Sequence, residues 1–447
     1  MAERSSAALR EALAAQTLGF SSADQTEVVV AGFDTALTRF THEACNQNVA
    51  ANDLLVCVRT VIDGRTGVAR TNQVDDRSLH DVVERSIALA RVANSDPLVP
   101  KMASDAPAAA PANAFDAATA RADASLRAGM AGAIFREAEG AGYWSAGFVA
   151  TSHKGITVAN TSGALASFDG TDAGVNVKMT APDSSGFAEA YSSGVGELDA
   201  ASLGRASAAK ARTSAAPSDI DTGAWTVILE PPAFGELLVY LSDHFSALNY
   251  DEGSSFCSDG LDRTYFSERV TIRDDYAHPL APGMPFDFEG QPKRRVALVE
   301  SGVVRNVVTD SYYAKKLGRA NTGHALPAPN SEGPQPQNLV VDPGTKPIEQ
   351  LVAETKRGLL VTRLWYTRTV DRKRAIVTGM TRDGTLLIED GKIVRGVHNL
   401  RFNQSILEVL RRCEFSSEQR RTASYSYALV CPYAKVEGFN FSSTTAF

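Results

Sequence analysis

The histidines are the first residues of this sequence whose side chains could bind a metal or transfer a proton. There are 7 of them, and His42-Glu43 begins like the zinc-protease pattern HExxH. That pattern needs a second histidine four positions after the first, so that both imidazoles lie on one face of a helix. The residue there is Asn46. His42 is therefore interpreted as an ordinary surface or core histidine.

Nucleophiles and phosphate-binding loops are the next candidates, and the sequence lacks their motifs. It contains no GxSxG turn and no Gly-rich phosphate loop. The 5 cysteines are scattered and never form CxxC. They fit the reduced thiols of a cytoplasmic protein better than a disulfide framework or a zinc ribbon. Motifs alone reveal no activity.

Two carboxylates, Asp287 and Glu289, are separated by one residue and come just before the basic pair Arg294-Arg295. Paired carboxylates can act as general acid and general base. In a strand-and-turn segment they more often form a turn or a salt bridge. The sequence leaves both roles open.

A small-residue loop follows, Asn321-Thr322-Gly323-His324-Ala325. It could lie against a peptide backbone, and a plain tight turn explains it equally well. Residues 310–316, between these two clusters, are interpreted as the start of an amphipathic helix with a basic end.

The elements that must position these clusters form two halves. The first half is expected to hold a helix, a strand, a hairpin about Asp63-Gly64, a helix capped by Ser78, a mobile surface loop, an Ala-rich helix, a β-meander and a closing helix. These are expected, in order, at residues 4–17, 27–31, 54–62 with 67–74, 78–90, 95–114, 116–139, 143–191 and 198–213.

The second half is expected to open with a strand at 225–229 and a helix at about 232–247, and then to consist mostly of strands. Its helices are expected near 311–318, 347–357 and 404–413, the middle one between Pro347 and Gly358, and its turns at Ser301-Gly302, Asp383-Gly384 and Asp390-Gly391. We predict an α+β fold of two domains. An N-terminal α/β sandwich-like domain spans 1–220, and a strand-rich, barrel-like domain spans 221–447.

The charge and hydropathy patterns limit the class of partner. The formal net charge is −7, from 45 basic and 52 acidic residues mixed along the chain. Without a run of like charge, nucleic acid is not expected as the main partner. The amino terminus does not resemble a secretory signal, and the most apolar stretch, 225–241, is broken by charged residues and prolines. A cytoplasmic protein that does not bind membranes is expected.

The order and spacing of these clusters carry a resemblance to a known family. The run PFDFEGQPKRRVALVESGVVRNVVTDSYYAKKLGRANTGHA, residues 285–325, resembles the TldD/PmbA (TldE) metalloprotease family, once named as modulators of DNA gyrase. The family pattern there is approximately a D-x-E-G turn, an IENG-like hairpin, a YxAxxLG helix and an STGHA-like loop. Further matches are Gln337-Asn338-Leu339, Pro343-Gly344, residues 356–362 and the ending CPYAKVEGFNFSS. The resemblance is strong from about 225 to 447 and weaker before.

This resemblance implies two α+β domains and a dimer that encloses a peptide-processing chamber. In the catalytic branch, TldD, an HExxxH helix and a later cysteine bind zinc, and the glutamate serves as general base. The matching residues here run from Leu238 to Asp243. Sliding the register by one would use His244 as the second ligand, but Val239 and Tyr240 would still stand where histidine and glutamate should be.

The later cysteine that would be the third zinc ligand also has no counterpart, because Cys413 comes too early in the sequence and Cys431 directly precedes Pro432. The chain is therefore similar to the TldE (PmbA) branch, which lacks the metal site and pairs with a TldD subunit. We expect no catalytic residue and no metal in this chain, and zinc only in a TldD-like, HExxxH-bearing partner. The implied function is the non-catalytic subunit of a heterodimeric zinc metalloprotease that processes or degrades unfolded or modified peptides.

The matched motifs also supply candidates for contact with the peptide: Asp287, Glu289, Gly290, Thr322, Gly323, His324 and Asn338. We expect the peptide to lie as an added strand along a sheet edge. Two alternatives stay open. One is a homodimeric peptide-binding or scaffold protein without protease activity. The other is a hydrolase with rearranged metal ligands among Asp243, His244, Asp251 and Glu252.

Overall fold

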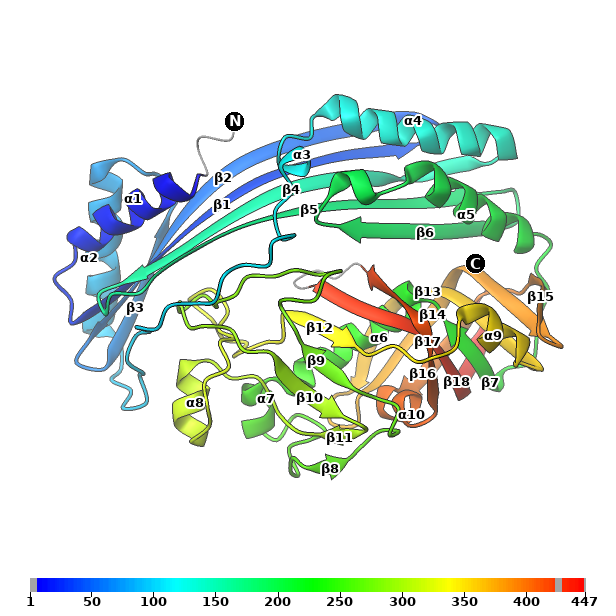
Figure 1. Cartoon of the computed structure of the whole chain (residues 1–447). Coiled ribbons are helices and arrows are strands. Elements are labelled where there is room, and N and C mark those ends of the chain that lie inside the picture. The colour runs from blue at the N-terminus through cyan, green and yellow to red at the C-terminus, as the bar shows by residue number, and fades with distance from the viewer. Residues whose placement is uncertain (1–5, 423–427, 446–447) are drawn as a thin grey trace.

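The computed structural model describes residues 6–422 and 428–445. Its strands form two sheets, one built from β1 to β6 and the other from β7 to β18. The first sheet arches over the second (Figure 1). The chain passes from one sheet to the other between α5 (Ala200–Thr213) and β7 (Gly223–Leu229). The predicted α+β class is confirmed. The predicted domain boundary near residue 221 lies between α5 and β7, where the chain changes sheets, and it stays a prediction.

The N-terminal sheet is antiparallel throughout, in the order β3-β2-β1-β4-β5-β6. Alternate residues of a strand face opposite sides of a sheet. Accordingly, Val28 and Val30 of β1 pack in one cluster with α1 and α2, while Val29 and Ala31 pack in another with residues of the C-terminal half. The strands are β1 (Gln25–Thr41), β2 (Ala44–Ile62), β3 (Arg65–Thr71), β4 (Trp144–Asn160), β5 (Leu165–Thr180) and β6 (Ser185–Ser192).

Helices cover the face of this sheet that is turned away from the second sheet (Figure 1). They are α1 (Ala7–Gly19), α2 (Asp76–Val92), α4 (Ala124–Ala141) and α5, with the short α3 (Ala117–Ala120) between α2 and α4. Helix α5 lies so close to β6 that a Cβ on Gly186 would stand 2.1 Å from the backbone oxygen of Ser207. The Ser207 hydroxyl donates to the Gly186 carbonyl at 2.9 Å, so both residues fix the helix on the sheet.

The C-terminal half is strand-rich and barrel-like, as predicted. Strands β7, β13, β14, β16 and β18 close a ring, because β16 pairs with both β14 and β18 while β7 joins β18 to β13. The strands after β7 are β8 (Arg263–Thr264), β9 (Ile272–Asp274), β10 (Val296–Glu300), β11 (Val303–Val304), β12 (Asn338–Val341), β13 (Arg357–Asp371), β14 (Ile376–Glu389), β15 (Lys392–Gly396), β16 (Leu400–Ser405), β17 (Cys413–Thr422) and β18 (Ala428–Thr444). The helices are α6 (Pro231–Ser242), α7 (Ala247–Asp251), α8 (Ser311–Leu317), α9 (Ile348–Ala353) and α10 (Ile406–Arg411).

Several predicted elements differ in detail from the observed ones. The cap of α2 is Asp75 rather than Ser78, because the Asp75 carboxylate accepts from the Ser78 N–H. The helix expected at 116–139 is divided into α3 and α4, and Asp123 caps the second part. The helix expected at 232–247 ends at Ser242, and a 3₁₀ turn leads into α7. At the starts of α2 and α4 the carboxylates of Asp75 and Asp123 accept from a backbone N–H of the first turn, and this fixes where each helix begins.

Two turn and cap assignments are also wrong. Asp383-Gly384 lies inside β14, where both residues have positive φ and the register with β13 shifts, so it forms a bulge and not a turn. Gly358 lies inside β13 and does not end α9. The turns at Ser301-Gly302 and Asp390-Gly391 are confirmed, since each joins neighbouring antiparallel strands.

The segment 95–114 has no helix or strand, as predicted, but it is fastened to both halves of the molecule. Its Met102 N–H donates to Gln25, and its Asn113 amide donates to the backbone oxygen of Pro279 at 2.8 Å. Lys315 of α8 donates to the backbone oxygen of Pro97 at 2.9 Å. These bonds do not support the expectation of a mobile surface loop.

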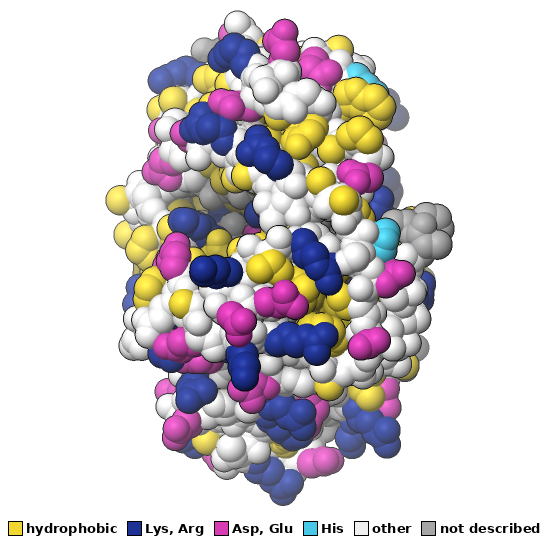
Figure 2. All heavy atoms as spheres, turned by 90° about the vertical axis from the view of Figure 1, so that its right-hand side faces the viewer, with side chains coloured by type: hydrophobic (Ala, Val, Ile, Leu, Met, Phe, Trp, Pro, Cys, Tyr) yellow, Lys and Arg dark blue, Asp and Glu magenta, His cyan; other side chains and the backbone are white. Residues whose placement is uncertain are grey.

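The outer surface mixes charges of both signs. On the face shown in Figure 2, Lys and Arg side chains are interspersed with Asp and Glu side chains. Within the described ranges, every helix is too short or too polar to cross a lipid bilayer.

Candidate functional site

The predicted acidic turn and the predicted small-residue loop lie against each other. The Arg294 N–H donates to the Thr322 carbonyl at 2.9 Å. Gly323 has φ +72°, and a Cβ there would stand 2.5 Å from the backbone oxygen of Pro292. Only glycine accommodates both this conformation and this contact. The spacing of the two motifs in the sequence thus corresponds to a direct contact in the fold.

Asp287 holds these two loops together. Its side chain is 0% exposed. One carboxylate oxygen accepts from the N–H of Glu289 at 2.9 Å and of Gln291 at 3.0 Å, and the other accepts from the N–H of Ala325 at 2.9 Å. Burial, and then the charge of Glu289, raise the pKa of Asp287, while these N–H donors lower it and stabilise the ionised form. The Asp287 carboxylate therefore has a structural role in the loops.

His324 lies in the same cluster, with Nε2 3.0 Å from Oδ1 of Asp274 and both side chains 0% exposed. Asp274 ends β9, and its other oxygen accepts from the Asn338 N–H at 2.8 Å. Burial alone would raise the pKa of Asp274, but the His324 imidazole and the Lys293 ammonium outweigh it and hold the pKa at about 2. An ionised carboxylate thus orients the imidazole inside the protein.

Glu289 points the other way, into an acidic cavity of about 510 Å³ between the N-terminal sheet and the segments 288–289 and 325–333. Its carboxylate accepts from the Ser311 N–H at 3.0 Å and lies 3.7 Å from the Arg59 guanidinium. Arg59 also donates twice to Glu27, at 3.0 and 2.8 Å. Asp310 lines the same cavity, and burial followed by the charge of Glu289 raises its pKa to about 6. We call this space, with three carboxylates around one guanidinium, the acidic cavity.

Asn338 lines a second space of about 350 Å³, between the inner face of the N-terminal sheet and the loop 282–293. Lys154, Lys293 and Arg421 also line it, and we call it the basic cavity. Gly290 lines neither cavity and packs against Val158 of β4, where a Cβ would lie 3.3 Å from a Val158 methyl group.

The structure thus brings the predicted contact residues into one cluster and separates their roles. Asp287, Gly323 and His324 are buried and bonded within the cluster, whereas Glu289 and Asn338 reach the two cavities. Contact with a peptide stays a prediction for all of them.

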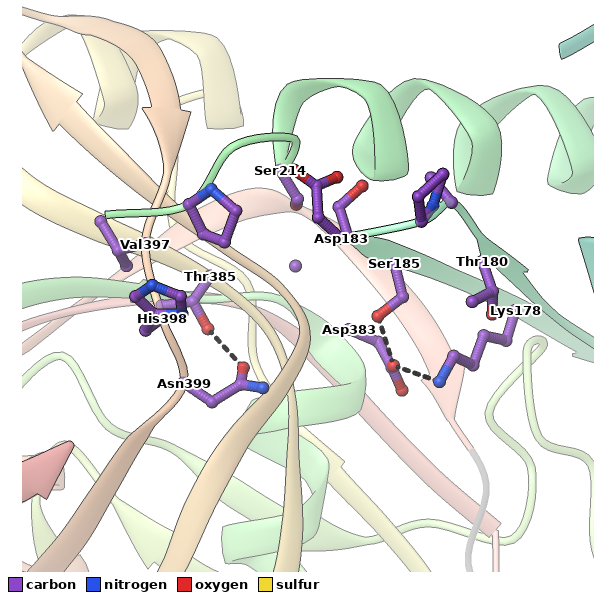
Figure 3. A pocket seen from close by; sticks show the side chains of 15 residues that line it. Lys178, Thr180, Asp183, Ser185, Ser214, Asp383, Thr385, Val397, His398 and Asn399 are labelled. Atoms are coloured by element: carbon purple, nitrogen blue, oxygen red, sulfur yellow. Dashed lines mark hydrogen bonds and ion pairs between the residues drawn. The ribbon is translucent and has the colours of Figure 1, made fainter. Parts of the chain in front are cut away.

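A third, smaller cavity of about 260 Å³ lies where the β5–β6 hairpin meets the C-terminal barrel (Figure 3). Asp383 of the β14 bulge is 2% exposed and accepts from Ser185 at 2.8 Å. It also pairs with Lys178 at 3.1 Å and with Arg363 at 2.7 Å. In Figure 3 Asp383, Ser185 and Lys178 gather on one side of the cavity and His398 lies on the other. Asp383 therefore joins the two halves of the molecule.

The segment that matches the zinc helix in the resemblance is the end of α6. Leu238 and Leu241 are 0% exposed and belong to the main hydrophobic core. The Tyr240 hydroxyl donates to the backbone oxygen of Thr367 in β13. Zinc in proteins is held by imidazole, thiolate or carboxylate groups. Of the side chains at 238–243 only Asp243 is of this kind, so the segment does not fit the ligand set of a zinc ion.

His244 follows α6 and is 4% exposed. Its Nδ1 accepts from the Phe256 N–H at 3.3 Å. Burial, and then the charge of Arg372, lower the pKa of His244 to about 4. The imidazole is therefore neutral at pH 7, and its Nδ1 already accepts a hydrogen bond from the backbone.

The alternative of rearranged ligands gains no support from this geometry. Asp251 pairs with Lys316 at 2.6 Å. In residues 6–422 and 428–445, no three His, Cys, Asp or Glu side chains are grouped so that they could hold a metal ion. Of the cysteines near the barrel, Cys413 and Cys431 are 1% and 0% exposed, and burial raises the pKa of both thiols.

Several residues of the cavities were not found by sequence reasoning. Arg59 and Lys154 come from strands of the N-terminal half, distant in sequence from the recognised motifs, and the buried Asp274, which lines neither cavity, ends β9 just before them. Asp310 lay within a segment that was recognised, but only as a helix start. In the structure Asp310 is the N-cap of α8, because its carboxylate accepts from the Tyr313 N–H at 2.8 Å.

The sequence matches one family model and several curated relatives. Residues 222–443 match the model of the PmbA/TldA metallopeptidase C-terminal domain. Three curated relatives match shorter stretches: an uncharacterised protein of Methanocaldococcus jannaschii (31% identical over 135 residues), a zinc metalloprotease TldD homolog of Saccharolobus solfataricus (29% over 144) and metalloprotease PmbA of Escherichia coli O157:H7 (32% over 115). These stretches cover 30%, 30% and 25% of this chain, and 30%, 31% and 23% of the relatives. The matches therefore span less than a third of each relative.

Solved structures share the fold over nearly the whole chain. TldE from Thermococcus kodakarensis superposes with a TM-score of 0.87 at 19% identity, covering 97% of this chain and 99% of that one. A proposed modulator of DNA gyrase from Bacteroides thetaiotaomicron gives a TM-score of 0.83 at 18% identity, covering 97% and 98%. At such identities the likeness establishes the fold.

Proposed function

The chain belongs to the PmbA/TldD family through its C-terminal half, and we propose that it is the non-catalytic subunit of a two-subunit zinc metalloprotease that processes unfolded or modified peptides. The observation that carries this proposal is the end of α6. Leu238 packs in the core and Val239 packs against it, where the catalytic branch would present the first zinc ligand and the general base. The names of two relatives, a zinc metalloprotease TldD homolog and metalloprotease PmbA, supply the reaction class.

The role of this chain would be to shape the space in which the partner acts. Its cavities lie between the arched sheet and the barrel, and their walls carry charged groups that a peptide could contact. The edge of β2 offers a further surface. From Ala44 to Leu55 this strand pairs with β1 alone, since pairing with β3 begins at Val56. A free edge of this kind can accept an extended peptide as an added strand.

The proposal is tested by zinc analysis and reconstitution. The purified full-length chain, dialysed against metal-free buffer, should contain no stoichiometric zinc and should not hydrolyse a denatured protein substrate. Mixing it with the HExxxH-bearing homologue from the same genome should produce a stable complex with more peptidase activity than that homologue alone. If the two chains do not associate, the heterodimer is refuted and the homodimeric peptide-binding protein becomes the better account.

A further inference from the structure

The basic cavity lies inside one chain, between the two halves. Its floor is the inner face of the N-terminal sheet, including Lys154 and Ile156 of β4 and Phe168 of β5. Its roof is the loop 282–293 together with the start of β12. Its volume of about 350 Å³ lies in the range of about 300–1,000 Å³ that is usual for small-ligand sites.

The charged side chains that line this cavity are unequal in sign. Lys154, Lys293 and Arg421 are cationic, and Asp172 is the carboxylate among the described lining residues. Asp172 already pairs with Arg421. Lys293 is 5% exposed, and its ammonium donates to the Gln337 side chain at 2.6 Å. The pairing of Asp172 with Arg421 leaves the two lysines in excess.

Two further carboxylates lie behind Lys293, and they reduce its effect on the cavity. Asp274 and Asp287 both act on the Lys293 ammonium through space, although burial still lowers the pKa of Lys293. Their oxygens are already engaged, by His324 and by backbone N–H groups. The cationic group that stays available in the cavity is therefore Lys154.

Lys154 is accessible from the cavity, and in residues 6–422 and 428–445 it makes no ion pair. Its stem crosses the sheet over Gly170, where a Cβ would lie 3.5 Å from the Lys154 Cε. Enclosure by protein atoms lowers the pKa of Lys154, and the charge of Asp172 opposes this shift. Lys154 is exposed, so an anion can reach its ammonium from the cavity and pair with it.

Apolar groups surround this charge. Ile156, Phe168, Met284 and Phe288 line the cavity and belong to, or pack against, one hydrophobic cluster that joins the two halves. A cation set among apolar walls suits an organic anion better than a fully hydrated inorganic one, because the walls bury its carbon atoms while the cation pairs with its charge.

We propose that the basic cavity binds a carboxylate group of a peptide, with Lys154 as its main cationic contact. The inference rests on the proposed function, because it assumes that this chain handles peptides. The carboxylate is either the peptide carboxyl terminus or an acidic side chain. Both present the same chemistry to Lys154, and the test separates them.

The test is isothermal titration calorimetry on the full-length chain with three N-acetylated alanine tetrapeptides. The first has a free carboxyl terminus, the second is its amide, and the third is an amide with one glutamate. The chain should bind the first or the third at least about tenfold more tightly than the second, as expected for a charge-assisted hydrogen bond. Which of the two binds identifies the source of the carboxylate.

Variants assign the preference to the cavity. Lys154→Met should remove the difference between the peptides, and Lys154→Arg should keep it. Lys392→Met is the control, since Lys392 is exposed on β15 outside the cavity. Thermal unfolding shows whether Lys154→Met folds. If it does not fold, the salt dependence of the unaltered chain replaces it as the test, and the preference for the carboxylate-bearing peptide over the amide must weaken as salt is added.

The proposal is overturned if the three peptides bind equally, including if none binds, or if Lys154→Met retains the preference. This test needs neither zinc nor the partner subunit. A failure here therefore leaves the reconstitution result untouched. Conversely, a failed reconstitution with an intact carboxylate preference would reject the two-subunit protease and keep the peptide site.

Discussion

The roles of the imidazoles in this molecule are determined by burial and by the groups beside them. His324 lies 3.0 Å from an ionised, buried Asp274, whereas His244 accepts a backbone N–H and is held neutral. Neither difference is visible in the sequence, where each is a lone histidine. Asp274, which orients His324, is 50 positions away along the chain.

The first prediction concerns His324. In the variant His324→Ala the buried carboxylate of Asp274 would lose its imidazole partner. Breaking a buried pair costs on the order of 3–5 kcal/mol. The free energy of unfolding, measured by urea denaturation at pH 7, should fall by about that amount. His398→Ala is the control, because His398 is exposed, and it should change stability by less than about 0.5 kcal/mol. Equal losses in both variants would reject the structural role of His324.

The second prediction concerns the pH dependence of His244. Its pKa is about 4 in the folded chain and about 6.5 in the unfolded one. The unfolded state therefore binds more protons between these values. The stability contributed by the neutral imidazole is complete above pH 6.5 and is lost as the pH falls to 4, by about 3 kcal/mol in total.

The variant His244→Asn tests this, since its amide oxygen can accept the Phe256 N–H in place of Nδ1. Urea denaturation at pH 7.0 and at pH 4.5 should show a smaller loss of stability in the variant than in the unaltered chain. Peptide turnover by the reconstituted pair should be unchanged. Identical pH dependence in both proteins would show that His244 does not titrate as described.

At the scale of elements, the strands were located by the sequence but their lengths were not. A strand was expected at 27–31, and β1 extends from Gln25 to Thr41. Residues such as Gly32 and Asp34 have low strand propensity, but pairing with β2 on one side and β4 on the other extends the strand through them. Such pairing is set by the whole sheet, and local propensity does not contain it.

In the candidate site, too, the local motifs could be predicted from the sequence, but the residues brought to them by the fold could not. The turn at 285–290 and the loop at 321–325 were recognised as motifs, and the structure places them in contact. The charged residues around them, such as Arg59 and Lys154, come from the other half of the chain and carry no local signal. Their positions follow only from how the arched sheet lies on the barrel.

The third prediction concerns the packing of α5 on β6. Gly186→Ala would place a Cβ 2.1 Å from the Ser207 carbonyl oxygen, and neither backbone can yield easily. Overpacking of this kind costs about 1–3 kcal/mol or more. Gly129→Ala in α4 is the control, because a Cβ there meets nothing within 4 Å and should stabilise the helix by about 0.5–1 kcal/mol. Thermal unfolding should therefore shift in opposite directions for the two variants, and a stabilising Gly186→Ala would contradict the observed packing.

At the scale of the whole molecule, the two halves meet through polar and apolar contacts together. Asp383 links Lys178 of β5 to Arg363 of β13, and Met284 and Phe286 pack against the inner face of the N-terminal sheet. The cavities lie along this junction, so their shape depends on both halves. Under the proposed function, this junction shapes a surface that binds peptides. Because α6 carries no zinc ligands, the hydrolysis itself would be left to the partner subunit.

The zinc content of the purified full-length chain tests this central claim most directly. Elemental analysis after dialysis against metal-free buffer should give a zinc-to-chain ratio near zero, because the buried Leu238 stands at the first ligand position and, among the described residues, no three His, Cys, Asp or Glu side chains are grouped around Asp243 or elsewhere to hold a metal ion. The HExxxH-bearing homologue, treated in the same way, should retain zinc. A ratio near one zinc per chain in the present protein would contradict the account and would identify it as a metalloenzyme in its own right.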